Sequence, residues 1–125
     1  MKTTKVIRIT ALIMSLFLSS CYYDEVAVIE GVPTGVSLKN DVQPIFDNYC
    51  NNTNCHDAEG SHAPVLVYPD TYNALKFGGF VKPFEPQNSI LFILVKTGEM
   101  PPSGPLDINS QKLIEGWITD GALNN

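Results

Sequence analysis

The fold of this 125-residue chain is decided by one stretch, Cys50-Asn51-Asn52-Thr53-Asn54-Cys55-His56. It places two cysteines in one short run and a histidine directly after the second of them. Thiols and an imidazole gathered in this way are typical of covalent cofactor attachment, a disulfide, metal binding or thiol redox chemistry. The residues around the stretch must decide among these.

The order of the three functional residues resembles the c-type haem attachment motif, Cys-x-x-Cys-His. In that motif two thiols bond the vinyl carbons of the porphyrin, and the adjacent histidine supplies an axial nitrogen to iron. Cys55 and His56 keep the contiguity that fixes one thioether and the iron ligand together. The spacer here has four residues instead of two. Because Cys50 need only reach the second vinyl group, it can be carried on a longer loop, and such four-residue variants occur among multihaem cytochromes c.

Three other interpretations of these residues remain open. A disulfide between Cys50 and Cys55 would stabilise a small domain in an oxidising compartment. A zinc site would use the same two cysteines with His56 and His62, all crowded into one loop. A redox dithiol would favour a two-residue spacer beside a βαβ pattern, which the sequence lacks.

The N-terminus has the features of a bacterial lipoprotein signal. Three basic residues in the first eight positions precede a short apolar run, 11–18, which ends in Leu18-Ser19-Ser20-Cys21. The run is too short to cross a bilayer, since a helical span needs about 20 apolar residues. The last four residues resemble a lipobox, so we expect 1–20 to be a signal peptide and Cys21 to be lipidated. Ordinary cleavage nearby would leave Cys21 an unpaired thiol, which is disfavoured in a secreted protein.

The charge of the chain excludes nucleic acid as a partner. The chain has 13 acidic and 8 basic residues, for a net charge of −5. The predicted signal peptide carries three basic residues and no acidic one, so the mature charge is −8. A chain this acidic does not attract anionic headgroups, and membrane association would rest on the acyl chains at Cys21. We expect a location in the bacterial cell envelope, facing the periplasm or the cell surface.

Met100 is the only methionine beyond the predicted signal peptide. It stands in Gly98-Glu99-Met100-Pro101-Pro102, where two prolines stiffen the backbone. A lone methionine more often fills a core, but this one lies in a proline-rich loop. A thioether is also the axial ligand that raises the potential of a haem used for electron transfer. We therefore predict that Met100 is an iron ligand.

Residues 38–123 as a whole resemble small single-haem cytochromes c and the cytochrome c domains of secreted and membrane-anchored bacterial proteins. The resemblance implies an all-α, cytochrome c-like domain of about four short helices wrapped around one covalently bound haem c. It implies Cys50 and Cys55 as attachment sites, His56 as proximal ligand and Met100 as distal ligand. Phe84 stands where these proteins usually have glycine. The resemblance runs through Asp41-Val42-Gln43-Pro44-Ile45-Phe46, the cysteine motif, Gly79, Val81, Pro83, Pro86, Ser89, Leu91, Met100-Pro101-Pro102, Leu113, Ile114, Trp117, Ile118, Gly121 and Ala122.

The hydrophobic pattern predicts helices near 41–50, 71–77, 88–97 and 108–120. The first would be capped by Asn40 or Asp41, and the last by Asp107. Residues 90–95 are apolar all round and fit a buried strand equally well by periodicity; the helix start signals before them favour a helix. Residues 21–37 mix acids, valines, glycines and a proline, which predicts a lipidated cysteine followed by a flexible tether, and the cytochrome c domain occupies 38–125.

These features predict an electron-transfer protein and not an enzyme, because ligands on both sides of iron leave no open position for a substrate. The expected partners are redox proteins and, through the lipid anchor, the membrane. We expect a backbone carbonyl within 63–66 to accept a hydrogen bond from His56, and His62 to face solvent. We expect Phe46 and Trp117 to pack in the core. Two alternatives remain: a haem sensor in which Met100 is displaced by a ligand, and a cofactor-free structural lipoprotein stapled by a disulfide.

Overall fold

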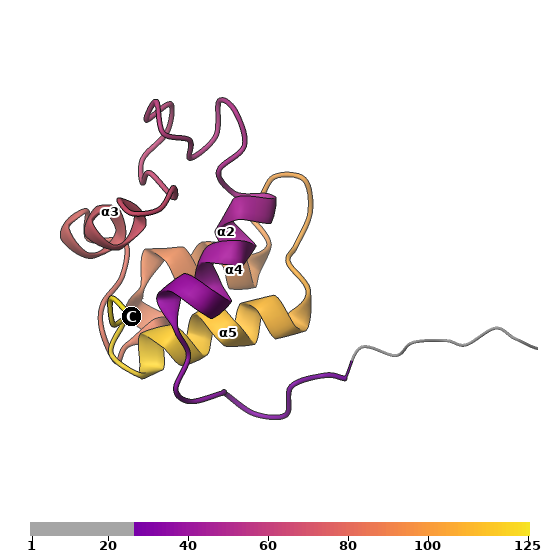
Figure 1. Ribbon diagram of the computed structural model, residues 1–125. Helices are drawn as coiled ribbons and strands as arrows, with labels where there is room; N and C mark the ends of the chain where they lie inside the picture. The colour runs from indigo at the N-terminus through magenta and orange to yellow at the C-terminus, as the bar shows by residue number, and fades with distance from the viewer. Residues whose placement is uncertain (1–26) are drawn as a thin grey trace, which may run out of the picture.

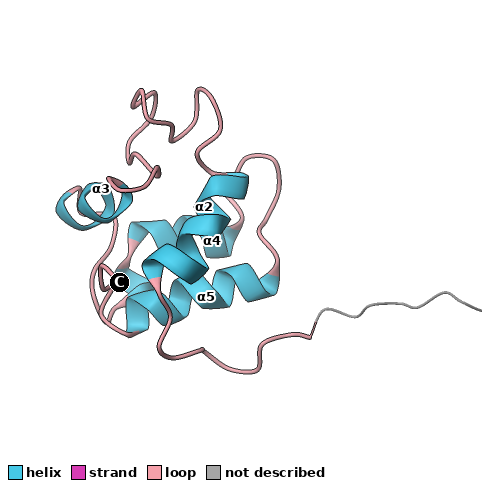
Figure 2. Cartoon of the chain, viewed as in Figure 1, coloured by secondary structure: helices cyan, strands magenta, loops and turns pink. Residues whose placement is uncertain are grey.

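The computed structural model describes residues 27–125. Within them the chain forms helices and loops and no strand, so the predicted all-α class is confirmed (Figures 1 and 2). The predicted signal peptide, 1–20, and the predicted lipidation site Cys21 lie outside the described residues. The elements in chain order are the π-helix η1 (Leu38–Val42), α2 (Gln43–Tyr49), α3 (Thr71–Phe77), the 3-10 helix η2 (Pro86–Asn88), α4 (Ile90–Thr97) and α5 (Ile108–Thr119).

The first predicted helix begins earlier than its hydrophobic stripe indicates. Its N-cap is Ser37, and the prediction of Asn40 or Asp41 is wrong. The Ser37 hydroxyl accepts a hydrogen bond from Asn40 N–H at 3.2 Å, and the Asp41 carboxylate accepts one from Ser37 N–H at 2.8 Å. This reciprocal pair works like a capping box, so one extra turn of helix is stabilised before α2.

The apolar run 90–95 lies in α4, which confirms the helical interpretation. The helix starts at Ile90 and not at 88, because the buried Ser89 hydroxyl bonds to backbone groups on two sides. It accepts from Lys82 N–H at 2.9 Å and donates to Glu85 O at 2.9 Å. These bonds hold η2 as a separate short turn before α4.

The predicted cap of α5 is confirmed. The Asp107 carboxylate accepts hydrogen bonds from Asn109 N–H and Ser110 N–H, both at 3.0 Å. The Ser110 hydroxyl donates to the same carboxylate at 2.5 Å. These bonds, led by the one from the Ser110 hydroxyl, lower the pKa of Asp107 below its ordinary value.

One apolar core joins the first and last helical segments. Phe46 and Trp117 are both buried in it, as predicted, and Trp117 Nε1 donates to Leu123 O at 2.8 Å. Direct packing between the two ends of the domain runs largely through η1 and α5. The core consists of Val36, Leu38, Val42, Ile45, Phe46, Leu66, Leu75, Val81, Leu91, Phe92, Val95, Leu106, Ile114, Trp117, Ile118 and Ala122.

The described part of the predicted tether, residues 27–37, is not free. Ile29 N–H donates to Asn109 Oδ1 at 2.8 Å, and Gly35 N–H donates to the Asp120 carboxylate at 2.6 Å. Between these points Pro33 lies so close to Gly116 that a Cβ there would be 2.4 Å from the Pro33 carbonyl oxygen. In Figure 1 this segment runs beside α5. The expectation of a flexible tether up to residue 37 is therefore wrong, because backbone donors and a close glycine contact fix this stretch to α5.

Phe84 adopts a φ of +68°, in the left-handed region that favours glycine. Its N–H donates to Ile118 O at 2.8 Å, and its ring lies against Gly121. The backbone thus has the conformation for which a glycine is expected at this position. In the part of the chain that is described, no helix has the length and apolar character needed to span a membrane.

Candidate functional site

A cavity of about 460 Å³ opens between the cysteine-bearing loop and α4. This volume is within the range of about 300–1,000 Å³ found for small-molecule and cofactor sites. The four predicted site residues, Cys50, Cys55, His56 and Met100, all line it, and so does His62. The structure therefore brings together residues that are up to 50 positions apart in the sequence.

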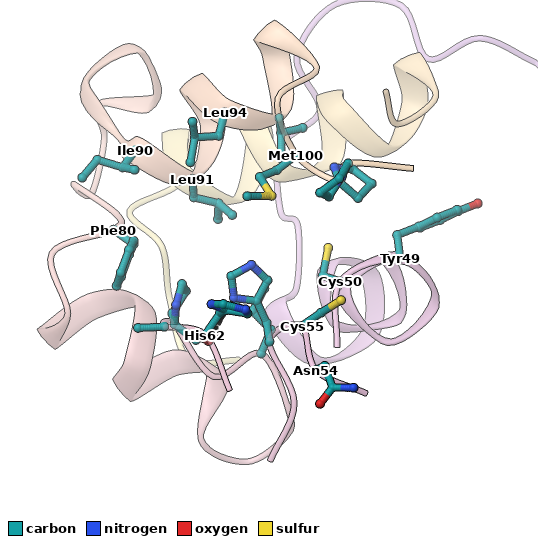
Figure 3. A pocket seen from close by; sticks show the side chains of 17 residues that line it. Tyr49, Cys50, Asn54, Cys55, His62, Phe80, Ile90, Leu91, Leu94 and Met100 are labelled. Atoms are coloured by element: carbon teal, nitrogen blue, oxygen red, sulfur yellow. Dashed lines mark hydrogen bonds between the residues drawn. The ribbon is translucent and has the colours of Figure 1, made fainter. Parts of the chain in front are cut away.

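The loop between the two cysteines closes on itself. His56 N–H donates to Cys50 O at 3.2 Å, and Cys55 N–H donates to Asn52 O at 2.8 Å. The four-residue spacer therefore forms a turn, and His56 lies directly beside Cys50, the C-cap residue of α2. In Figure 3 the sulfur atoms of Cys50 and Cys55 lie close to one another on the same side of the cavity. A longer spacer thus still brings the second cysteine and the histidine back to the first.

The His56 ring is oriented by two backbone carbonyls. Its Nδ1 atom lies 2.9 Å from Pro64 O and 3.2 Å from His62 O. The predicted hydrogen bond to a carbonyl within 63–66 is confirmed. Because a carbonyl oxygen can only accept, Nδ1 carries a proton, and this tautomer of the imidazole has its lone pair on Nε2. This is the arrangement that orients histidine ligands in metal sites.

Asp57 braces the backbone on both sides of Cys55 and His56. Its buried carboxylate accepts hydrogen bonds from Asn54 N–H at 2.7 Å, from Ser61 N–H at 3.1 Å and from the Ser61 hydroxyl at 3.0 Å. These bonds, led by that from Ser61 N–H, hold the pKa of Asp57 below its ordinary value. Asn54 has a φ of +65°, a left-handed conformation that asparagine tolerates and that turns the chain towards Asp57.

Met100 comes from the loop after α4 and reaches the cavity from a different side. Its N–H donates to Leu94 O at 3.1 Å, so the start of this loop is held to the end of α4. Its side chain is 37% exposed, and in Figure 3 its sulfur is directed into the space that the cysteine loop also borders. Pro101 and Pro102 line the cavity beside it.

The remaining wall is apolar. Phe80, Ile90, Leu91 and Leu94 line the side that faces the cysteines (Figure 3). Burial raises the pKa of the Cys50 thiol to about 11, and the neighbouring Cys55 adds to the increase. Cys50 therefore stays protonated near neutral pH. The site as a whole offers two imidazoles, one thioether and two thiols around a mostly apolar space, a donor set suited to a large apolar cofactor that contains iron.

The structure also bears on the zinc and disulfide interpretations. Cys50 and Cys55 are both free thiols. Residues 27–125 contain no group of three or more His, Cys, Asp or Glu side chains positioned to bind a metal ion. The two cysteines and two histidines of the zinc interpretation are therefore not gathered around one point. His62 is exposed, as predicted, although it lies at the edge of the cavity.

Comparisons with known proteins leave the site to be interpreted from its own residues. No protein-family model matches the chain, and neither a curated protein nor a solved structure matches it significantly.

Sequence reasoning missed Asp57 and the apolar wall. An aspartate followed by Gly60 and Ser61 is typical of side chain-stabilised turns, so Asp57 had a local signal. No sequence signal distinguished Ile90 and Leu94, because apolar residues at this spacing also fit ordinary core packing. Ile90 is 47% exposed and lines the cavity while its neighbour in α4, Phe92, is buried in the core.

Proposed function

We propose that this chain is a single-haem c-type cytochrome that carries electrons outside the cytoplasm. Cys50 and Cys55 would bind the haem covalently, and His56 and Met100 would be its axial ligands. The observation that carries the proposal is the His56 ring: two carbonyls hold its Nδ1 proton, so Nε2 is left free to bind iron in a cavity that Met100 and both thiols share. When bound, the haem would supply reversible one-electron chemistry at iron.

The cysteines are in a suitable state for attachment. Both are free, and both border the cavity. Each thiol would add across one vinyl group: a C–S bond forms, the vinyl π bond is lost, and the thiol proton ends on the adjacent carbon. This addition consumes no oxidant or reductant. The raised pKa of Cys50 keeps its proton on sulfur until that step.

The protein environment favours electron transfer over catalysis. Phe80, Leu91 and Leu94 give one side of the cavity an apolar surface. Two side-chain ligands would leave iron without an open position for a substrate. The Met100 thioether would raise the reduction potential relative to a second nitrogen ligand.

The test is the visible spectrum of the full chain, expressed with export and c-type haem maturation. We expect low-spin bands in both oxidation states, the weak far-red band of methionine-ligated ferric iron, and a pigment that resists extraction by acidic acetone. A colourless protein with a disulfide between Cys50 and Cys55 would refute the proposal and leave the structural lipoprotein standing.

Two histidines give a matched pair of variants. His56→Ala should abolish the low-spin spectrum, whereas His62→Ala should keep it, because His62 contributes its backbone carbonyl and not its ring to His56. Met100→Ala should lose the far-red band and lower the potential while the haem stays attached. Loss of the low-spin spectrum in the His62 variant instead would contradict the assigned ligands.

The position of Met100 favours a second candidate, a haem sensor whose methionine is displaced by a ligand. Met100 lies in the loop after α4 and not in a helix, so its side chain can move away without unfolding a helix. Adding carbon monoxide to the reduced protein separates the two functions. An unchanged spectrum supports electron transfer, and rapid conversion to a carbonyl spectrum supports the sensor.

We also propose that residues 1–20 are removed and that Cys21 carries lipid, which would place the domain at the surface of a membrane in the bacterial envelope. The support is the lipobox-like Leu18-Ser19-Ser20-Cys21 after a basic and apolar leader. Mass spectrometry of the mature protein from a bacterial membrane fraction should show an acylated N-terminal cysteine. Cys21→Ser should move the protein to the soluble fraction.

A further inference from the structure

The N-terminal segment, residues 27–37, follows α5 along its length in a defined direction. At its beginning, Asn109 Nδ2 donates to Ala27 O at 3.0 Å, and Ile29 N–H donates to Asn109 Oδ1 at 2.8 Å. At its end, Gly35 and Val36 donate to the Asp120 carboxylate at 2.6 and 3.2 Å. Residue 27 therefore lies at the N-terminal end of α5, and the segment leads away from it towards the C-terminal end.

Two further contacts fix the segment, one near its beginning and one at its centre. Near the beginning, the Lys112 ammonium donates to Ile29 O. Gly116 lets the Pro33 carbonyl approach so closely that no larger residue fits without a shift of the backbone. The segment is thus attached to α5 near both of its ends and at its centre, so its starting point cannot move independently of the domain.

Covalent geometry limits how far this starting point can lie from Cys21. Six Cα–Cα steps separate Cys21 from Ala27, and a fully extended chain covers at most about 22 Å over them. A flexible tether that ended at residue 37 would allow about 58 Å over its sixteen steps. The docked segment therefore shortens the possible separation between anchor and domain more than twofold.

We infer that the segment orients the domain on a lipid surface, with the N-terminal end of α5 and the preceding Met100-bearing loop facing the bilayer. This inference rests on the proposed lipidation of Cys21. The end in question has apolar side chains on its surface, since Val28 is 59% exposed and Ile108 is 48% exposed. The ammonium of Lys112, in the second turn of α5, is hydrogen-bonded to Ile29 O. Apolar side chains, and not charged ones, would therefore make the contact with neutral lipid.

The opposite end of the domain faces away from the surface. Phe84 N–H bonds to Ile118 O, so the chain entering α4 lies at the C-terminal end of α5. Figure 1 shows the same arrangement, with α3 and the end of α5 on one side and the start of α5 on the other. Ile90 is the first residue of α4, and Ile93 lies one turn further along the same helix. These two isoleucines therefore report on the end of the domain opposite Ile108.

The experiment uses the full-length lipidated protein in phosphatidylcholine nanodiscs, with labelled isoleucine methyl groups. A gadolinium chelate on a fraction of the lipid headgroups broadens methyl signals near the surface, and measurements are made in the reduced state. The 12-residue helix α5 is about 18 Å long. Summed over a plane of labelled headgroups, the effect falls with about the fourth power of height. A height of about 22 Å at Ile108 and about 40 Å at the opposite end therefore predicts roughly tenfold stronger relaxation enhancement at Ile108 than at Ile90 and Ile93.

Two variants separate the anchor from the orientation. Cys21→Ser should remove the broadening from every methyl group. A glycine-serine insertion of about 20 residues after Val26 should keep the protein on the nanodisc and make the enhancement at the two ends similar. Equal enhancement at Ile108 and Ile90 in the unmodified protein would overturn the orientation while the anchor stands. Absence of broadening throughout the unmodified protein would overturn the anchor itself.

Discussion

Replacing Gly116 with alanine tests whether residues 27–37 are packed against α5. The added Cβ would lie 2.4 Å from Pro33 O and 3.0 Å from side-chain atoms of Pro33 and Val36. Contacts this short require the segment to shift, and its hydrogen bonds to Asp120 resist that shift. The substitution should therefore destabilise the folded protein.

The expected magnitude is the difference of two effects. Overpacking a buried site costs about 1–3 kcal/mol. Alanine in a helix interior is more favourable than glycine by about 0.8–1.0 kcal/mol. The net loss in unfolding free energy should be about 1 kcal/mol, which lowers Tm by about 4–8 °C in a domain of this size. If the segment were a free tether, only the higher helix propensity of alanine would act, and Gly116→Ala would raise Tm by a similar amount.

Chemical and thermal unfolding followed by circular dichroism measure this difference directly. Asp120→Ala provides the coupling partner, because it removes the carboxylate that holds Gly35 and Val36. The penalty of Gly116→Ala should shrink in that background, since the segment can then move away. An alanine variant that is more stable than the parent protein would show that the reasoning about the docked segment is wrong.

Three further predictions concern the helix cap, the core and the cysteine loop. Asp107→Ala should cost about 1 kcal/mol at neutral pH. Because hydrogen bonds led by that from the Ser110 hydroxyl lower the folded-state pKa of Asp107, its stabilisation is present above its unfolded pKa of about 3.9 and is lost as pH falls through the lower folded value. The urea unfolding midpoints of variant and parent should therefore converge as the pH of the measurement falls below about 4. A difference that stays constant with pH would contradict the capping role of Asp107. Ile114→Ala removes a fully buried side chain and should cost about 2–5 kcal/mol in urea unfolding, whereas the same change at the exposed isoleucine that opens α5 should cost little; equal losses would argue against the described core. Asp57→Ala should lower the fraction of purified protein that carries covalently bound haem, measured by absorbance per protein, and the exposed Glu59→Ala is the control that should leave it unchanged.

The helices were predictable where one local feature dominated. Asp107 caps α5 as expected because an aspartate before an apolar-periodic run has one obvious function. The start of the first helix was not predictable in the same way, since Ser37, Asn40 and Asp41 are all good capping residues. Which of them caps the helix depends on which backbone N–H groups its side chain can reach. In the structure the Ser37 hydroxyl accepts from Asn40 N–H, and the Asp41 carboxylate accepts from Ser37 N–H.

The candidate site was predictable only as far as residue chemistry identifies it. Two cysteines, a histidine and a lone methionine followed by two prolines are conspicuous, and all four functional residues line the cavity. The apolar wall was not, because Ile90 and Leu94 have the same pattern as any core helix. The docked segment was also missed: its partner Gly116 lies about 80 positions away from Pro33, and a glycine in a helix gives no local sign of what approaches it.

The two walls of the cavity are held by different forces. One belongs to α4, whose Leu91 and Val95 extend into the buried core, so that wall is as stable as the helical half of the domain. The other is the loop 51–70, which contributes only Leu66 to that core and otherwise depends on polar contacts around Asp57 and the His56 ring. Hydrogen bonds each contribute only about 0.5–1.5 kcal/mol, so local opening of this loop should need far less free energy than unfolding of the helices. Covalent bonds at Cys50, the C-cap of α2, and at Cys55, within the loop, would join this loop to the end of α2 through the bound group. In the proposed cytochrome the second thioether would thus hold the loop that carries His56 in place beside the iron, in addition to its hydrogen bonds to the His56 ring and to Asp57.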